Sequence, residues 1–393
     1  MIFDPIRRFI RALRGQRAFS TLPQSQRKIV FYAEDSQSLV HFESIIRQLF
    51  DRFGEPVCYL TSAPDDPLLT EPLPGMKVFY VGDGLVRTIV FTGLRADLLV
   101  MTMPDLGNYH IKRSQNYPVH YLYLFHAMVS THSNYRKAAF DHFDTIFCTG
   151  PYQMAEIRKT EEVYGLRPKA LYADGYRRLE SMMEQIGTHR ESTGNTPLGE
   201  PRTVVIAPSW GEHAILESGL VFGLAERLLE AGYITIVRPH PMTTKNHPEI
   251  LEALNTRFGE NALFGLQLDI RDKRTLFDSH VMISDWSGVA LEYAFACERP
   301  VLFLDVPKKC NNPESERIGI IPVEVSLRER LGRVISPDAL DTIPQAIEQI
   351  YGDRAAFVEQ IRQTREASVY NLGNSLDGAV EKIVEIARVK PDD

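Results

Sequence analysis

The chain has 393 residues, of which 44% are hydrophobic and 24% charged. This composition excludes a largely disordered, collagen-like or disulfide-stapled protein, and the length predicts two to three domains. The 44 Lys and Arg against 51 Asp and Glu give a net charge of −7, which excludes a general nucleic-acid binder. The 4 cysteines are scattered without metal-ligand spacing, as in reduced cytoplasmic proteins, and no membrane-spanning or signal-peptide pattern occurs.

Residues 1–17 predict a short basic amphipathic helix. They hold five arginines and one acid, so their charge of +4 within a total of −7 leaves −11 for the rest of the chain. Ile6, Phe9, Ile10 and Leu13 recur at helical spacing. Such a helix can lie in the headgroup region of an anionic membrane leaflet. It can equally pack on its own domain with its arginines in solvent, and the sequence leaves both interpretations open.

After a polar spacer, short apolar runs alternate with stretches of helical period. Strands that are buried on both faces are continuous apolar runs, so this alternation predicts a parallel α/β sheet. The expected strands of the first half are Ile29–Ala33, Val57–Leu60, Val78–Val81, Leu98–Thr102, Tyr121–Phe125 and Ile146–Cys148, with helices at 37–52 and 151–164.

Residues 187–202 lose this periodicity and gather Gly, Pro, Ser and Thr, which predicts a linker. The alternation then resumes, with expected strands at Val204–Ala207, Ile234–Val237, Val281–Ser284 and Val301–Leu304 and helices near 218–231, 271–279, 287–297, 340–352, 354–368 and 376–389. We therefore expect an N-terminal helix (1–19), a Rossmann-like domain (28–186), the linker (187–202) and a second Rossmann-like domain (203–393). Two such domains facing a central cleft would offer a favoured place for ligands.

One glycine motif resembles the start of a dinucleotide fingerprint. Gly82-Asp-Gly84 follows an expected strand and opens a helix, but Arg87 stands where the third glycine belongs. An ordinary strand-to-helix turn is therefore the favoured interpretation. The chain also has no Walker A lysine motif, no G-x-S-x-G and no H-E-x-x-H, which argues against an NTPase, an α/β-hydrolase and a zinc protease.

The strongest local signal is the run Ser284-Asp285-Trp286-Ser287-Gly288, between an expected strand and an expected helix. The first N–H groups of the helix and the Ser287 hydroxyl can hold a phosphate there. Glu292, one turn inside the helix, can accept hydrogen bonds from ribose hydroxyls. The alternative is an ordinary helix N-cap, in which Ser287 or Asp285 contributes only stability.

Two further polar loops follow neighbouring strands. Arg238-Pro-His240-Pro stands at the end of one, and Ser209-Trp210 follows another. Ligands of open α/β sheets bind outside the carboxyl ends of strands, where an arginine and a histidine held between prolines can meet phosphate oxygens. Each loop alone can be a rigid turn with solvated side chains, but three at one sheet edge favour a binding site.

In the first half, the expected strand Tyr121–Phe125 places His126 at its end, and His132 follows. A histidine titrates near neutral pH and is the usual general base for activating a hydroxyl. A single histidine is more often structural, so that role stays open for His126, and His132 stays an alternative base.

Several blocks together resemble the CDP-glycerol glycerophosphotransferase family, the enzymes of teichoic-acid priming and polymerisation. The resemblance covers roughly residues 120–306 and rests on the order and spacing of the blocks. They are Phe125-His126, Gly175-Tyr-Arg177-Arg178-Leu-Glu180, Ile206-Ala-Pro208-Ser209-Trp210, Arg238-Pro-His240-Pro241, Asp272-Lys-Arg-Thr-Leu-Phe277, Ser284-Asp285-Trp286-Ser287-Gly288 and Arg299-Pro300-Val-Leu-Phe-Leu304-Asp305. It implies a GT-B architecture in which the C-terminal Rossmann-like domain holds the nucleotide.

The resemblance also implies roles. His126 matches the proposed base, and His240 with Arg238 matches the Arg-x-His-Pro at the donor pyrophosphate. Ser287 and the backbone of Gly288 match a phosphate-binding Ser-Ser pair, and Glu292 falls where GT-B enzymes often place a ribose-binding carboxylate. The assigned catalytic residues are thus His126 and His240, and the donor-binding residues are Arg238, Ser209, Ser284, Asp285, Ser287, Gly288 and Glu292.

This sequence departs from the family pattern at several positions. Phe125-His126-Ala127 replaces the usual Trp-His-Gly, Trp286 and Gly288 replace a tyrosine and a second serine, and Ser284 stands where threonine is common. These changes leave the catalytic scheme in place and put the substrate in doubt.

The expected reaction is transfer of glycerol phosphate from CDP-glycerol to a hydroxyl of a lipid- or glycan-linked acceptor, with release of CMP. It requires no cofactor and no metal, and we expect it at the cytoplasmic face of the inner membrane, contacted through residues 1–17. Two alternatives remain at this point. One is a GT-B glycosyltransferase that uses a nucleotide sugar, and the other is a non-catalytic nucleotide-binding protein of envelope assembly.

Overall fold

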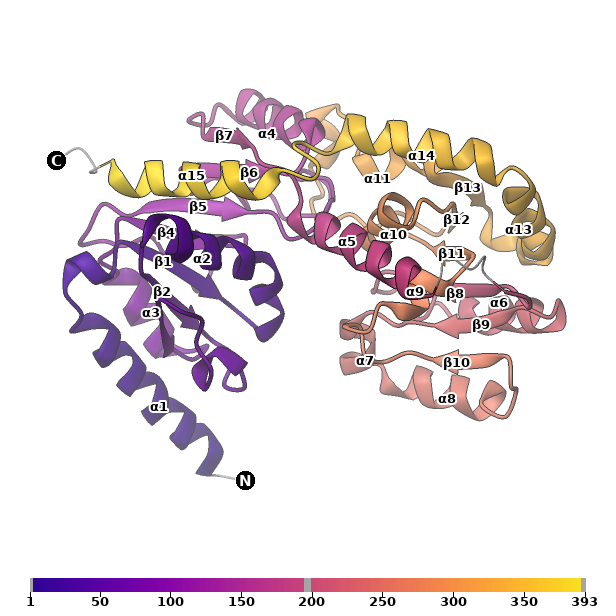
Figure 1. Cartoon of the computed structure of the whole chain (residues 1–393), viewed down its shortest axis with the longest axis horizontal. Helices are drawn as coiled ribbons and strands as arrows, with labels where there is room; N and C mark the ends of the chain where they lie inside the picture. The colour runs from indigo at the N-terminus through magenta and orange to yellow at the C-terminus, as the bar shows by residue number, and fades with distance from the viewer. Residues whose placement is uncertain (1–2, 194–198, 390–393) are drawn as a thin grey trace. The chain divides into compact units, whose positions relative to one another are not determined.

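The computed structural model describes residues 3–193 and 199–389. The chain divides into two compact units, and each is described by itself (Figure 1). Unit 1 consists of the described parts of Met1–His126, Tyr135–Arg178 and Val369–Asp393. Unit 2 consists of those of Ala127–Asn134 and Leu179–Ser368.

Unit 1 is built on a seven-stranded sheet with the strand order β3-β2-β1-β4-β5-β6-β7, in which every neighbouring pair is parallel. The strands are β1 (Ile29–Ala33), β2 (Val57–Thr61), β3 (Met76–Tyr80), β4 (Leu98–Met101), β5 (His120–Leu124), β6 (Thr145–Cys148) and β7 (Ala170–Ala173). All five residues of β1 are buried, which explains its unbroken apolar run.

The helices of unit 1 cover this sheet. They are α1 (Phe3–Ser20), α2 (Leu39–Phe53), α3 (Leu85–Thr92), α4 (Pro151–Tyr164) and α15 (Ser375–Arg388). Helix α2 ends where Gly54 adopts a left-handed conformation (φ 63°) and its N–H bonds back to the last turn. Helix α15 packs against α2, and its Ala379, Val380 and Ile383 complete the same buried core (Figure 1).

Unit 2 is built on a six-stranded parallel sheet with the order β10-β9-β8-β11-β12-β13. The strands are β8 (Thr203–Ile206), β9 (Ile234–Val237), β10 (Phe264–Leu266), β11 (Val281–Ser284), β12 (Val301–Leu304) and β13 (Gly332–Ile335). In both units the strand order reverses beside the first strand, as in the Rossmann fold, and ligands of such sheets bind at that switch point.

The helices of unit 2 are α5 (Arg177–Ser192, which begins in unit 1), α6 (Leu220–Glu230), α7 (Pro241–Asn246), α8 (Pro248–Phe258), α9 (Arg274–Asp278), α10 (Gly288–Cys297), α11 (Val323–Ser326), α12 (Arg328–Leu331), α13 (Ile343–Gly352) and α14 (Arg354–Ser368). Helix α10 is buried from Ala290 to Cys297 and is apolar around most of its circumference, as a central helix must be.

The predicted pair of Rossmann-like α/β domains is confirmed, and each expected strand is present within two residues of its predicted ends. Three strands escaped prediction: β7, β10 and β13. Each lies at the edge of its sheet and is half-exposed, so it lacks a buried apolar run. Cys58, Cys148 and Cys297 are buried free thiols, whereas Cys310 is an exposed free thiol.

Two boundaries differ from the expectation. Helix α5 continues through Ser192, so it occupies the start of the stretch predicted as a linker, of which 194–198 lie outside the described residues. The chain also returns to unit 1 at Val369, and α15 belongs there. The physical reason is the amphipathic pattern of α15, whose apolar side chains are covered by the core around α2.

Candidate functional site

The polar loops that the sequence singled out in unit 2 lie at one edge of its sheet. Strands β9, β8, β11 and β12 are adjacent and parallel, so the residues that follow them meet at the same carboxyl edge. Ser209 follows β8 and Asp285 follows β11, which places them on the two sides of the switch point. The structure therefore brings these predicted donor-binding loops together.

Asp285 ties the two loops to each other. Its side chain is 2% exposed and accepts three backbone N–H bonds, from Ser209 (2.6 Å), Trp286 (2.6 Å) and Ile215 (3.1 Å). The Ser284 hydroxyl also links two segments, because it donates to the carbonyl of Ala207 after β8 (2.7 Å). Both side chains thus hold the loops in place at this edge of the sheet.

The N-terminus of α10 opens into this edge. Ser287 is its N-cap residue and has an extended backbone, but within the described residues its hydroxyl caps no amide of the helix. The helix dipole and the first N–H groups favour an anion at this point. Gly288 is the first helical residue, and a Cβ there would approach the side chain of Val129 to 3.3 Å. Glu292 is buried one turn further along.

Trp286 is fixed by a buried arginine that sequence reasoning missed. Its indole N–H donates to the carbonyl of Val306 (3.0 Å), and the Arg328 guanidinium lies 3.7 Å from the ring centroid. Arg328 also donates to Asp305 (2.7 Å). Burial lowers the pKa of Arg328 from its ordinary value, while Asp305 and Asp285 oppose that shift. In the sequence Arg328 is only one arginine in a polar stretch, because the residues that it contacts are distant along the chain.

His240 is held as a neutral hydrogen-bond donor. It is the N-cap residue of α7, and its Nδ1 accepts the N–H of Met242 (3.1 Å), so the ring proton of the neutral form lies on Nε2. Burial, together with the charge of Lys309, lowers the pKa of His240 to about 4. At neutral pH this imidazole therefore presents an N–H and no charge.

Lys309 is a second functional candidate that the sequence did not reveal. Its Nζ donates to the carbonyl of Trp210 (2.9 Å) and lies 4.0 Å from the centroid of the Trp210 ring. The Trp210 ring is 6.1 Å from that of His240, so a cation stands beside the two predicted loops. Burial lowers the pKa of Lys309, and the charges of Asp285 and Glu217 counteract this.

Arg238 makes contacts other than those expected for a phosphate ligand. Its guanidinium donates to the Gln267 side chain (2.9 Å) and to the carbonyls of Asp272 (2.8 Å) and Ile270 (2.5 Å). In this arrangement Arg238 holds the loop between β10 and α9. The sequence placed it correctly at the strand end but could not give the direction of its side chain.

His126 lies at the carboxyl edge of the sheet in unit 1. Its Nδ1 is 3.1 Å from the carbonyl oxygen of Thr102 and 3.4 Å from the Tyr123 hydroxyl. Because a carbonyl oxygen only accepts, this contact places the proton of the neutral ring on Nδ1. Nε2 then holds the lone pair, which is the arrangement that a general base needs.

His132 has the opposite tautomer and lies in unit 2. It is buried, its Nε2 is 3.0 Å from the carbonyl oxygen of Ile320, and its Nδ1 is 3.0 Å from the Ser130 hydroxyl. Nε2 therefore donates and Nδ1 accepts, so both ring nitrogens bond within the protein. These contacts favour His126 over His132 as the base.

Sequence reasoning missed another histidine, His41 in the first turn of α2. Its ring centroid lies 6.2 Å from that of His126 and 6.5 Å from that of Tyr176. Burial, followed by the charges of Arg178, His126 and Arg177, holds the pKa of His41 well below its ordinary value. A neutral imidazole thus borders the candidate base.

The glycine motif forms a turn at which two elements of unit 1 meet. Gly82 has a left-handed backbone (φ 66°), and a Cβ there would lie 3.3 Å from the Cβ of Ala12 on α1. Arg87 is buried and donates to the Tyr32 hydroxyl (3.2 Å). These contacts favour the strand-to-helix turn over a dinucleotide site.

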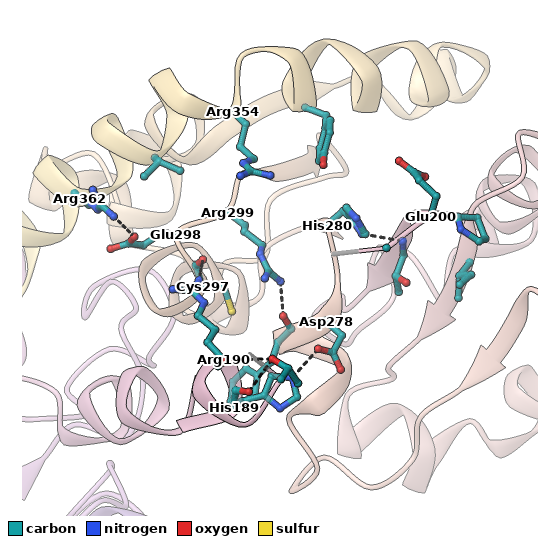
Figure 2. A pocket seen from close by; sticks show the side chains of 18 residues that line it. His189, Arg190, Glu200, Asp278, His280, Cys297, Glu298, Arg299, Arg354 and Arg362 are labelled. Atoms are coloured by element: carbon teal, nitrogen blue, oxygen red, sulfur yellow. Dashed lines mark hydrogen bonds and ion pairs between the residues drawn. The ribbon is translucent and has the colours of Figure 1, made fainter. Parts of the chain in front are cut away.

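A cavity of about 790 Å³ lies at the opposite edge of the unit 2 sheet (Figure 2). Its lining includes Thr203 and Ile234, the first residues of β8 and β9, so it lies away from the predicted donor residues. Three basic side chains in its wall already have protein partners: His189 bonds Asp278 (2.7 Å), Arg362 bonds Glu298 (2.6 Å), and Arg299 donates to backbone carbonyls.

No group of three or more His, Cys, Asp or Glu side chains in 3–193 and 199–389 is arranged to hold a metal ion. Among the helices in this part of the chain, none is both long enough and apolar enough to cross a membrane.

Comparison with solved structures shows the fold. The wall teichoic acid polymerase TagF has a TM-score of 0.54 and 14% identity, over 98% of this chain and 98% of that chain. A putative UDP-N-acetylglucosamine 2-epimerase from Listeria monocytogenes has a TM-score of 0.56 and 13% identity, and the match covers 94% of this chain and 99% of that chain. The UDP-GlcNAc 2-epimerase of Methanocaldococcus jannaschii was solved with UDP-GlcNAc and UDP. It has a TM-score of 0.53 and 13% identity, and the match covers 91% of this chain and 99% of that chain.

The chain therefore has the predicted GT-B-type fold of two Rossmann-like domains. Neither family models nor the sequences of curated proteins gave a match.

Proposed function

We propose that this protein is a transferase that moves glycerol phosphate from a CDP-linked donor to a hydroxyl of a lipid- or glycan-linked acceptor in cell-envelope polymer synthesis. The observation that carries the proposal is the orientation of His126. Its Nδ1 faces the carbonyl of Thr102, so its Nε2 has the lone pair that can accept a proton from a hydroxyl.

In the proposed reaction, His126 takes up the proton and CMP is the leaving group. The acceptor hydroxyl gives its proton to His126 Nε2, and its oxygen forms a bond to the β-phosphorus of CDP-glycerol. The bond between that phosphorus and the oxygen that bridges to the α-phosphorus breaks, and CMP leaves with the electron pair. Phosphoryl transfer depends mainly on positioning and on stabilisation of charge on the phosphoryl oxygens.

The carboxyl edge of unit 2 offers donors for that charge. They are the N–H groups at the start of α10, the Ser287 hydroxyl, His240 Nε2 and the ammonium of Lys309. Glu292 would accept hydrogen bonds from the ribose, while Asp285 and Arg238 would hold the loops in place. In this scheme CDP-glycerol is a substrate, and neither a cofactor nor a metal takes part.

The acceptor and the location belong to the same proposal. A lipid-linked acceptor cannot leave the membrane, so the enzyme would work at the cytoplasmic face of the inner membrane. The basic amphipathic segment 1–17 is the element that would bring it there.

The first test is a thermal-shift panel on the purified protein with CDP-glycerol, CDP-ribitol, CDP, CMP, UDP and UDP-sugars. A ligand that binds only the folded protein raises its free energy of unfolding by about 2.7 kcal/mol when present at 100 times its Kd. We expect stabilisation by cytidine diphosphates over uridine diphosphates. The reverse preference would contradict polyol-phosphate transfer.

The second test separates the two histidines. His126→Ala should lower turnover by about 10²–10⁴-fold, since that is the usual contribution of a positioned base, while the thermal shift with CDP-glycerol persists. His132→Gln is the matched comparison, and it should retain turnover in the molecules that fold. An active His126→Ala enzyme would refute the assignment.

A nucleotide-sugar glycosyltransferase is the second candidate, because a structural neighbour was solved with UDP-GlcNAc and UDP. Such an enzyme would use the same helix-end phosphate site but attack an anomeric carbon. The released nucleotide decides between them: CMP from CDP-glycerol supports the proposal, and UDP from a sugar donor supports the alternative.

A further inference from the structure

Helix α1 packs on unit 1 through one narrow face. Gly15 approaches β3 so closely that a Cβ there would lie 2.1 Å from the carbonyl oxygen of Tyr80. Ala12 and Phe19, on the same side of the helix, are buried. Arg11 donates to the carbonyl of Pro64 (2.7 Å), and its guanidinium lies 5.0 Å from the centroid of the Tyr80 ring. Helix α1 thus covers the edge strand β3 with the side that carries Ala12, Gly15 and Phe19.

The large apolar side chains of α1 are on a different face and remain in solvent. Ile6, Phe9, Ile10 and Leu13 are 54%, 47%, 44% and 40% exposed. They follow each other at helical i, i+3, i+4 and i+7 spacing, so they form one continuous stripe. A helix that only covered its own domain would turn this stripe inward. The structure buries Ala12 and Phe19 instead.

Helix α3 extends the stripe. Leu85 and Ile89 lie one turn apart and are 67% and 46% exposed, although their helix neighbours Val86 and Val90 are buried. Helix α1 contacts α3, and a groove of about 350 Å³ between them is lined by Phe9, Ala12 and Leu85 among others. Figure 1 shows the two helices beside each other in unit 1. We call Ile6, Phe9, Ile10, Leu13, Leu85 and Ile89 the α1–α3 apolar face.

Exposed arginines of α1 border this face. At about 100° per residue, Arg7 and Arg14 lie beside Ile10, and Arg17 lies one turn beyond Leu13. All three are exposed. The segment is therefore positively charged in a chain that is otherwise acidic, which selects a negatively charged partner.

We propose that the α1–α3 apolar face docks on an anionic lipid bilayer. The apolar side chains of both helices enter the boundary between headgroups and acyl chains, the groove receives an acyl chain, and the arginines lie among the headgroup phosphates. This surface is larger than the terminal segment alone, because α3 contributes two of its six apolar residues. Binding strength rises with the apolar area that is buried, so the second helix strengthens the attachment and orients the unit.

Docking of this face also has a consequence for the acceptor, and this consequence rests on the proposed function. Gly82, which lines the groove, follows β3, and His126 follows β5, so both lie at the same edge of the parallel sheet. Four strand spacings separate β3 from β5 in the order β3-β2-β1-β4-β5, or roughly 19 Å at about 4.8 Å each. The acceptor hydroxyl would therefore stand roughly this far from the lipid chain, which favours an acceptor with an extended hydrophilic headgroup.

The test is sedimentation of the full-length protein with vesicles of phosphatidylcholine alone and of phosphatidylcholine mixed with phosphatidylglycerol, with no nucleotide present. We expect binding to the mixed vesicles and a decrease as salt is raised, since surface electrostatics are screened.

Two pairs of variants locate the surface. Phe9→Ser with Leu85→Ser should weaken binding to the mixed vesicles by on the order of tenfold or more, because each removes a large apolar side chain from the interface. Leu268→Ser with Ile321→Ser is the matched control, since these side chains are 55% and 67% exposed in unit 2. The control should bind as the unchanged protein does.

Arg7→Gln with Arg14→Gln should also weaken binding to the mixed vesicles, by about thirtyfold, since each of the two basic residues near an anionic surface contributes about 1 kcal/mol. Arg271→Gln, at an exposed arginine of unit 2, is its control.

Three outcomes would overturn the proposal. They are equal sedimentation with both vesicle types, equal loss in the control variants, or a concentration-dependent dimer that Phe9→Ser dissolves. The last would make the face an interface between copies of the chain. Since the assay contains no nucleotide, its failure leaves the thermal-shift test standing, and failure of that test leaves membrane docking unaffected.

Discussion

Replacement of Asp285 should lower the stability of unit 2 through a small set of named contacts. Its buried carboxylate accepts the backbone N–H groups of Ser209, Ile215 and Trp286, so Asp285→Ala would leave three donors without their acceptor. These amides belong to loops that lie next to each other at the switch point of the sheet. The change should therefore affect both the stability of unit 2 and the shape of the proposed donor site.

The magnitude follows from the contacts. A hydrogen bond to a charged group contributes about 1.5–3 kcal/mol, so three independent bonds would sum to about 4.5–9 kcal/mol. The three share one carboxylate and are not additive, and water can enter the space that truncation opens. We expect Asp285→Ala to lower the free energy of unfolding by about 3–5 kcal/mol. Asp285→Asn keeps one acceptor oxygen but turns an NH₂ toward a donor, and we expect a loss of about 1–3 kcal/mol.

The chain offers a local probe for this measurement. Its 2 tryptophans, Trp210 and Trp286, both lie in the loops that Asp285 connects. Urea unfolding followed by tryptophan fluorescence therefore reports on unit 2 alone, which avoids fitting a two-domain protein as one transition. Asp269→Ala is the control, because that exposed carboxylate pairs with the nearby Arg271 at the surface, and it should leave the urea midpoint unchanged.

A loss below about 1 kcal/mol for Asp285→Ala would refute this account, since that is less than one hydrogen bond of this kind contributes. A loss as large as expected, without any decrease in CDP-glycerol affinity, would instead separate loop stability from donor binding. It would remove Asp285 from the proposed site while leaving its structural role intact.

Three further outcomes are expected. The pKa of His240 is about 4 in the folded protein against an ordinary value near 6.5, so the unfolded state takes up the proton first. The stability of unit 2 should therefore fall as pH drops from about 6.5 to about 4, and His240→Asn, which still accepts the N–H of Met242, should reduce that dependence in urea titrations at several pH values. Lys309→Met should raise the pKa of His240, measured by NMR, because it removes the neighbouring cation; an unchanged pKa would contradict the assigned contact. Gly15→Ala should destabilise unit 1 by about 1–3 kcal/mol, since the new Cβ would meet the Tyr80 carbonyl, and an unchanged melting temperature would contradict the packing of α1.

The sequence by itself determined the elements that have a local signal. Strands such as β1 and β2 are buried on both faces and stand out as apolar runs, and α4 begins at a Gly-Pro pair and ends at Gly165. Repetition of this pattern on both sides of residues 187–202 was enough to predict two parallel α/β domains. It also placed Ser209, His240 and Ser287 at one sheet edge, because the carboxyl ends of parallel strands lie at the same edge.

Only the tertiary structure decided what each polar or apolar side chain faces. The return of α15 to unit 1, the direction of Arg238 toward the loop that precedes α9, and the position of Lys309 beside Trp210 all depend on partners distant in sequence. The ring nitrogen that carries the proton in His126 and in His132 is assigned from one backbone carbonyl at each ring. For α1, periodicity identified the apolar stripe, but the close approach of Gly15 to Tyr80 decided that another face packs on the sheet. Local pattern specifies which side chains share a face, and long-range packing specifies what covers it.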